Sequence, residues 1–151
     1  KVLEPSSELK LCLAIDVGVF PQTASPSEYF EAALSLAASM ACWAEDQGVP
    51  YGLLANGDLK GASGPVNIPI NCSPNQAPRV LESMARMELK PLLPLWKLLK
   101  SKNSRLPWGT TLFIIGSGNY EVPPEVCRVI LHPYTNSIPL SANRNSRREK
   151  E

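Results

Sequence analysis

The sequence predicts an α/β fold in which helices cover both faces of a mixed sheet. Short, nearly continuous apolar runs at residues 10–17, 51–56 and 110–115 are typical of strands that are buried on both faces. Helical patterns at residues 26–47 and 77–89 lie between these runs, which favours parallel strands joined by crossovers. The predicted architecture is therefore a three-layer α/β sandwich, and it is Rossmann-like.

The length and composition describe one globular domain with few groups for catalysis. The chain has 151 residues, of which 44% are hydrophobic and 19% are charged. Its net charge of +1 excludes a general electrostatic nucleic-acid binder. The chain carries one histidine, and its only aspartates are Asp16, Asp46 and Asp58. We therefore expect no enzymatic activity.

The ends of the chain and its cysteines indicate the domain bounds and the cellular compartment that we expect. We expect residues 1–140 to form the domain, excised from a larger protein, and residues 141–151 to form a charged, mobile tail. Because no apolar run approaches 18 residues, this fragment is expected to make no membrane contact of its own. The four cysteines form no close pair, which favours reduced, buried thiols in the cytoplasm: Cys12, Cys42, Cys72 and Cys127.

The first long helix is expected at residues 26–47. Ser25 can cap it, Pro26 suits the first helical position, Glu28 completes a capping box, and Gly48 can end it. Polar residues repeat every four positions along this helix and form a narrow stripe: Glu31, Ser35 and Ser39. We expect the rest of the helix surface, which is rich in alanine, to be buried against the sheet.

Residues 65–70 are predicted to be an edge strand, because Pro65 and Pro69 cannot donate to a ladder. The preceding Asn56-Gly57 is a turn signal, and the short link favours an antiparallel hairpin with residues 51–56.

The second half of the chain is expected to contain two helices and two strands. The helix at residues 77–89 can be capped by Ser73 or Asn75, and a further helix covers residues 95–102 with a basic outer face. Residues 126–131 are predicted to be the last strand, although residues 123–125 could equally open a helical turn. The three tryptophans are interpreted as core or core-edge residues: Trp43, Trp96 and Trp108.

The functional rim of such a sheet lies beyond the carboxyl ends of its parallel strands. Here that rim carries residues 16–20 and 116–119. The candidate binding residues at the rim are Asp16, Gly18, Phe20, Gly116, Ser117 and Asn119.

Two segments narrow the fold to a known family. Residues 34–39 (LSLAAS) and 48–56 (GVPYGLLAN), followed by Gly109-Thr110-Thr111, resemble a von Willebrand factor type A domain. In particular they are similar to the bacterial family of unknown function number fifty-eight, whose members occur beside MoxR-type AAA+ ATPases. The resemblance covers residues 2–115.

This resemblance bears on metal binding at Asp16. In von Willebrand A domains the first strand ends in Asp-x-Ser-x-Ser, which binds Mg²⁺ together with residues of two other loops. Here Asp16 is present, but Gly18 and Phe20 replace both serines, and Ser117 is the one further oxygen donor at the later strand end. Because Mg²⁺ favours octahedral oxygen ligands, we expect a degenerate site and no cofactor. We expect Asp16 instead to cap the backbone that follows it or to be solvated at the strand end.

The leading functional hypothesis is a non-enzymatic protein-interaction or scaffold domain. The resemblance implies a bacterial parent protein anchored to the inner membrane, with this domain in the cytoplasm and a MoxR-type AAA+ ATPase as partner. The alternative is a Mg²⁺-dependent adhesion-type module that binds a partner's acidic residue through Asp16. A hydrolase using Asp16 and the turn at residues 116–119 ranks last.

Overall fold

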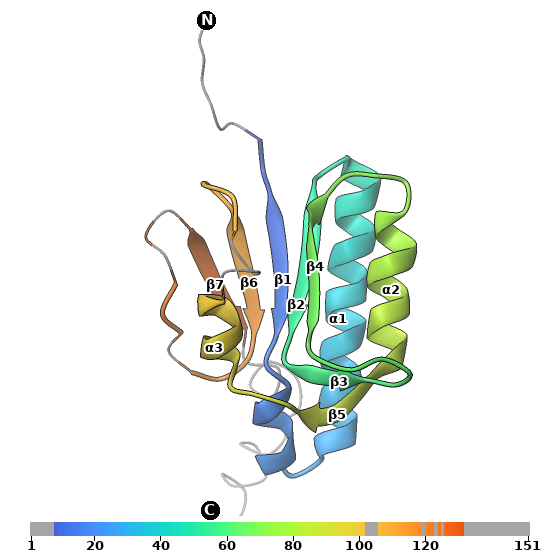
Figure 1. Ribbon diagram of the computed structural model, residues 1–151, viewed down its shortest axis with the longest axis vertical. Helices are drawn as coiled ribbons and strands as arrows, with labels where there is room; N and C mark the ends of the chain where they lie inside the picture. The colour runs from blue at the N-terminus through green and yellow to red at the C-terminus, as the bar shows by residue number, and fades with distance from the viewer. Residues whose placement is uncertain (1–7, 102–105, 119, 123, 125, 132–151) are drawn as a thin grey trace, which may run out of the picture.

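A five-stranded mixed sheet forms the middle layer of the molecule, in the order β4-β2-β1-β6-β7 (Figure 1). The computed structural model describes residues 8–101, 106–118, 120–122, 124 and 126–131. Only the β2–β4 pairing is antiparallel, which confirms both the mixed sheet and the predicted edge strand. The strands are β1 (Leu11–Ile15), β2 (Tyr51–Ala55), β4 (Val66–Asn71), β6 (Thr111–Ile115) and β7 (Cys127–Leu131).

Helices cover both faces of this sheet, so the predicted three layers are confirmed. Every residue of β1 is buried, with alternate side chains entering two separate cores. Leu13 belongs to the core under α1 (Pro26–Gln47) and α2 (Gln76–Arg86). Ala14 belongs to the core under α3 (Leu95–Lys100), on the opposite face.

The bounds of α1 are as predicted, but its capping box is not formed. Ser25 is the N-cap residue, yet its side chain makes no capping hydrogen bond. The backbone angles of Ser25 are φ −137° and ψ 76°. Pro26 follows it at the first helical position, where its ring already fixes a helical φ. Gly48 ends the helix in the left-handed region at φ 67°.

The buried face of α1 is narrower than expected. Small residues approach the sheet as predicted, with Ala37 and Ala41 fully enclosed. Leu36 on the same helix is exposed, so the prediction that all but a polar stripe is buried is wrong. The tryptophan prediction is also wrong, because the exposed fractions are 50% for Trp43, 48% for Trp96 and 65% for Trp108.

A small antiparallel sheet of β3 (Gly57–Leu59) and β5 (Met87–Pro91) lies at the carboxyl edge of the main sheet (Figure 1). The prediction of a turn at Asn56-Gly57 is therefore wrong, because β3 begins at Gly57. Glycine is needed at this position for close packing, since a Cβ on Gly57 would lie 2.8 Å from Cγ2 of Val17. The chain turns later, where Gly61 has a φ of 86°.

The predicted helix at residues 77–89 ends earlier, at Arg86. Its carbonyl accepts a hydrogen bond of 2.9 Å from the Lys60 amide, and Met87 is extended with φ −72° and ψ 131°. Pairing with β3 therefore replaces the last expected turn of helix. Neither Ser73 nor Asn75 caps α2 through its side chain: Asn75 is the N-cap residue but makes no such bond.

The later elements otherwise follow the predictions within the described residues. The strand at residues 126–131 is present as β7, and α3 ends at Lys100. Lys102, Asn119, His132 and the expected tail at residues 141–151 lie outside the described residues.

The pairing of β2 with β4 depends on Gly52 and Gln76. A Cβ on Gly52 would overlap the Ile68 carbonyl oxygen, so β4 approaches β2 this closely only over a glycine. The register shifts between Tyr51 and Leu53, and the fully buried Gln76 Nε2 donates to the Tyr51 and Pro69 carbonyls beside this irregularity. Its amide thus joins the two strands where the ladder is interrupted.

The prediction that all four thiols are buried holds for Cys12 alone. The other three are exposed: Cys42, Cys72 and Cys127. Burial raises the pKa of the Cys12 thiol to about 12. Separately, none of the helices within the described ranges combines the length and the apolar composition needed to cross a bilayer.

Replacing Ala37 with leucine is expected to lower the free energy of unfolding by about 1–3 kcal/mol, because the fully enclosed site under α1 has no room for three more carbons. Urea denaturation measures this change. The matched control is Ala32→Leu on the exposed side of the same helix, which should change stability by less than about 0.5 kcal/mol. Equal effects of the two substitutions would contradict the assigned buried face.

Thiol labelling at pH 8 should separate Cys12 from the other three cysteines. A thiol with a pKa near 12 is about one part in ten thousand thiolate at this pH, and its sulfur is enclosed as well. We expect rapid labelling of Cys42, Cys72 and Cys127, and labelling of Cys12 only after denaturant is added. Rapid reaction of all four thiols in the native protein, measured by mass spectrometry, would show that the β1 core is open.

Candidate functional site

The carboxyl ends of three neighbouring parallel strands meet at one edge of the sheet. Ile15 of β1 is in register with Ala55 of β2 and Ile115 of β6. The next residues along these strands are therefore adjacent in space, and the Asp16 amide donates to the Ile115 carbonyl at 3.0 Å. This is the predicted rim, and Asp16, Asn56 and Gly116 begin it.

Both carboxylate oxygens of Asp16 accept hydrogen bonds from the protein. Oδ1 accepts from the Gly18 amide and from Nδ2 of Asn56, each at 3.1 Å. Oδ2 accepts from the Tyr120 hydroxyl at 2.6 Å, a short bond of the kind that ionised acceptors form. Asp16 is also the N-cap of the 3₁₀ helix η1 (Val17–Gln22), so the capping expected of it is present.

Asn56 is the most connected side chain of the rim, and it is 1% exposed. Its Oδ1 accepts from the Val17 amide at 2.7 Å, while its Nδ2 donates to the Leu93 carbonyl at 2.8 Å as well as to Asp16. Its backbone carbonyl accepts from the Leu92 amide at 2.8 Å. One buried residue therefore joins the end of β2 to η1 and to the segment between β5 and α3.

Tyr120 closes the rim over the end of β6. Its hydroxyl donates to Asp16 and accepts from the Ser117 amide at 3.1 Å. A Cβ on Gly116 would overlap this hydroxyl, so the glycine makes room for the ring. Gly116 is consequently buried beneath Tyr120, while the Ser117 backbone helps to hold the phenol in place.

A hollow of about 460 Å³ opens beside these groups, and we call it the rim hollow. Its wall is formed by η1, by the segment between β5 and α3, and by Tyr120. Trp96 and Leu92 are its exposed apolar side chains, and the Lys97 and Lys100 ammonium groups each lie 5.6 Å from the Trp96 ring centre. The lining residues are Asp16, Gly18, Val19, Gln22, Asn56, Pro91, Leu92, Leu93, Pro94, Leu95, Trp96 and Tyr120.

The candidate residues proposed from the sequence divide into three groups. Asp16 and Gly18 line the rim hollow. Phe20 is fully buried and packs on Phe30 with ring centres 5.6 Å apart, so it is a core residue and cannot contact a partner. Gly116 and Ser117 support Tyr120 from below, and Asn119 lies outside the described residues.

Three residues of this region were not singled out as site residues from the sequence: Asn56, Tyr120 and Trp96. Asn56 was interpreted as part of a turn, and Trp96 as a core or core-edge residue. Strand-end position alone could have identified Asn56, because it follows β2 as Asp16 follows β1. No local pattern marks Tyr120, which reaches Asp16 from 104 residues away along the chain.

The donors around Asp16 bear on the question of a metal. Its neighbours in the rim are an amide nitrogen, a backbone N–H and a hydroxyl that donates to it. Within the described residues, no group of three His, Cys, Asp or Glu side chains is placed to hold a metal ion. A cation at Asp16 would have to share the carboxylate with the three hydrogen bonds that it already accepts. The expectation that no Mg²⁺ binds stays a prediction.

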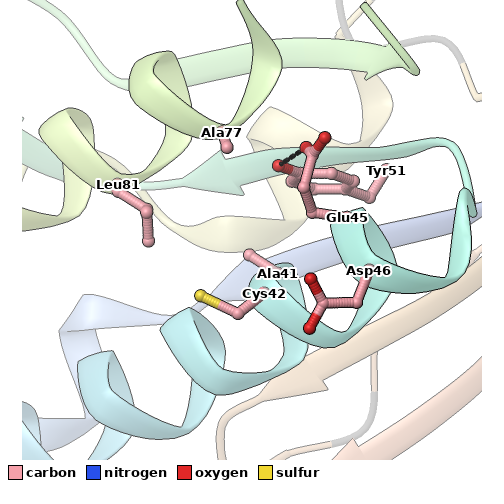
Figure 2. A pocket seen from close by; sticks show the side chains of 7 residues that line it. All are labelled: Ala41, Cys42, Glu45, Asp46, Tyr51, Ala77 and Leu81. Atoms are coloured by element: carbon pink, nitrogen blue, oxygen red, sulfur yellow. Dashed lines mark hydrogen bonds between the residues drawn. The ribbon is translucent and has the colours of Figure 1, made fainter. Parts of the chain in front are cut away.

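A second, smaller hollow of about 90 Å³ lies between α1 and α2 (Figure 2). Its polar centre is the hydrogen bond of 2.9 Å that the Tyr51 hydroxyl donates to Oε1 of Glu45. Burial raises the pKa of Tyr51, and the bond to Glu45 and its negative charge raise it further, so the phenol stays neutral. This hollow therefore supplies no base or nucleophile at neutral pH from its tyrosine.

Comparisons of this chain with models of protein families, with curated proteins and with solved structures found no match.

Replacing Asn56 with alanine should lower the free energy of unfolding by about 2–4 kcal/mol, because it leaves the Val17 amide and the Leu93 carbonyl unpaired in the interior. Chemical denaturation measures this change. Asn71→Ala is the matched control: Asn71 also accepts two backbone hydrogen bonds but is exposed, and its loss should cost about 1 kcal/mol or less. Similar losses for both variants would show that Asn56 does not hold the rim together.

Millimolar Mg²⁺ or Mn²⁺ is expected to leave the melting temperature unchanged, because within the described residues Asp16 belongs to no group of acidic, His or Cys side chains that could hold a metal, and its carboxylate already accepts three hydrogen bonds. A ligand present at 100 times its dissociation constant would stabilise the fold by about 2.7 kcal/mol, which calorimetry detects readily. A rise in melting temperature with Mg²⁺ that disappears in Asp16→Asn would contradict this prediction and favour an adhesion-type metal site.

Proposed function

We propose that this chain is a non-enzymatic protein-binding domain whose contact surface is the rim hollow. The observation that carries the proposal is that the wall of this hollow is largely apolar. Trp96 and Leu92 are exposed in it, and Pro91 and Pro94 also line it. Aromatic side chains near the centre of a concave apolar surface are typical of the few residues that dominate binding energy in protein interfaces.

The absence of a free catalytic group in the lining supports a binding role over an enzymatic one. Among the described residues that line the hollow, only Asp16 and Tyr120 have titratable side chains, and these two bond each other. A general base or nucleophile needs a partner oriented towards substrate. Here Asp16 instead fixes the backbone of η1 and the position of Tyr120.

The partner and setting in this proposal come from the sequence resemblance. Residues 34–39 and 48–56 resemble the von Willebrand A-like bacterial family of unknown function number fifty-eight, for which a MoxR-type AAA+ ATPase is the expected partner. The parent protein is then anchored to the inner membrane and presents this domain in the cytoplasm. The concave rim beyond the parallel strand ends is where such a domain would present its binding residues.

Isothermal titration of this chain with a MoxR-type AAA+ ATPase tests the proposal. We expect binding by the native chain and a loss of affinity of about thirtyfold in Trp96→Ala, as for a central interface tryptophan. Trp108→Ala is the matched control, because Trp108 is even more exposed than Trp96 but precedes β6 at the opposite edge of the sheet. No binding by the native chain, or equal losses in both variants, would contradict the proposed function.

A further inference from the structure

Two lysine side chains lie against the tryptophan that forms part of the wall of the rim hollow. Trp96, Lys97 and Lys100 all belong to α3, and all three side chains are exposed. The ammonium groups of Lys97 and Lys100 each lie 5.6 Å from the centre of the Trp96 ring. Both positive charges therefore border the apolar surface that the proposed function assigns to a partner.

The carboxylate in the lining of the hollow is already engaged by hydrogen bonds. Asp16 accepts two of them on Oδ1 and one on Oδ2, all from donors of this chain. These donors offset its negative charge, because each places the positive end of a dipole against a carboxylate oxygen. No other residue of the lining is charged. The lysines of α3 therefore set the sign of the charge beside Trp96.

One of these lysines already binds a carboxylate of this chain. Oε2 of Glu121 lies 3.4 Å from Nζ of Lys100, and the two side chains are 85% and 58% exposed. Glu121 follows Tyr120, which lines the hollow. Two consecutive residues thus present an aromatic ring to the hollow and a carboxylate to a lysine. An exposed ion pair of this kind contributes little, so a partner's acidic side chain can replace it.

The other lysine is available without displacing anything. Lys97 forms no ion pair with any residue that the structure describes, and its ammonium contacts the Trp96 ring. Lys90 of β5 is different, because its Nζ lies 3.8 Å from Oδ2 of Asp58. A carboxylate arriving beside Trp96 therefore meets the charge of Lys97 first, and that of Lys100 once its own ion pair opens.

These observations select the chemistry of the occupant. The apolar wall favours a bulky apolar side chain, and the volume of about 460 Å³ is in the range of about 300–1,000 Å³ that encloses a compact ligand. The lysines attract acidic groups and disfavour a basic segment. We infer that the rim hollow binds an acidic segment of the partner protein, with a bulky apolar residue in the hollow and acidic side chains on Lys97 and Lys100. This inference rests on the proposed function and adds the chemistry of the partner to it.

Three short fluorescein-labelled peptides test the inference with the full chain. The first has a central phenylalanine flanked by aspartate and glutamate, and the second has lysine at the same flanking positions. The third is the acidic peptide with serine in place of phenylalanine. In fluorescence anisotropy we expect the first peptide to bind at least about tenfold tighter than either of the others. Its advantage over the lysine peptide should shrink at high salt, because Lys97 and Lys100 are exposed.

Substitutions that remove single charges locate the acidic side chains of the peptide. Lys97→Gln should weaken binding of the acidic peptide about threefold, and the double variant with Lys100→Gln should weaken it about tenfold. Glu121→Gln should strengthen binding about twofold or more, because it releases Lys100. Lys10→Gln is the matched control and should leave binding unchanged, since it removes the same charge just before β1, at the opposite edge of the sheet.

The possible results separate this inference from the proposed function. Equal binding of the acidic and lysine peptides, lost for both in Trp96→Ala, would overturn the acidic partner and leave the rim hollow as the contact surface. No binding of the acidic peptide, or unchanged binding in the double lysine variant, would also overturn the inference, while titration with the ATPase tests the proposed function independently. Normal binding of the acidic peptide by Trp96→Ala would contradict both. Circular dichroism and thermal melts check that each variant folds.

Discussion

The hydrogen bonds of the buried Asn56 side chain are the interaction on which the rim at the carboxyl ends of the strands depends. Beyond the ends of β1 and β2 the chain must leave the sheet, and backbone groups that no longer pair in a ladder need other partners. Asn56 supplies them: its side chain satisfies the Val17 amide and the Leu93 carbonyl, and its own carbonyl satisfies the Leu92 amide. The start of η1 and the segment leading to α3 are thereby fixed relative to each other.

The position of Trp96 follows from this constraint. The segment that contains Leu92 and Leu93 leads directly into α3, so the Asn56 hydrogen bonds set where the helix begins. Asp16 accepts a hydrogen bond from Nδ2 of Asn56 and another from the Tyr120 hydroxyl, which holds Tyr120 on the other side of the hollow. The side chains of Asn56, Asp16 and Tyr120 thus form a polar network that shapes the largely apolar rim hollow.

The sequence predicted the main sheet well because its signals there are local. Continuous apolar runs identified β1, β2 and β6, and two prolines identified β4 as an edge. The small β3–β5 sheet was not predicted, since each strand is short and Asn56-Gly57 is locally indistinguishable from a turn. The exposure of Trp43 was not predictable either: it depends on which helices neighbour α1, and a helix that is apolar on most sides carries no sign of a missing neighbour.

The residues of the rim were predicted only in part, because several of them are placed there by tertiary contacts and not by local sequence signals. Asp16 could be identified because it ends a buried strand, whereas Tyr120 and Trp96 reach the site from irregular or short segments whose path is set by tertiary contacts. Phe20 was misassigned because η1 turns its side chain back into the core against Phe30. A position near a strand end does not by itself determine where a side chain points.

The pairing of β1 with β6 has a consequence for synthesis on the ribosome. Leu11 pairs with Thr111, so the central strand gains its second neighbour only after another 100 residues have been translated. Until then β1 and β2 form a sheet with a bare, apolar edge, which is the kind of surface that recruits other unfinished chains. Closing such a long loop also slows folding. Nascent chains that stall before β6 should therefore depend on chaperones to remain unaggregated.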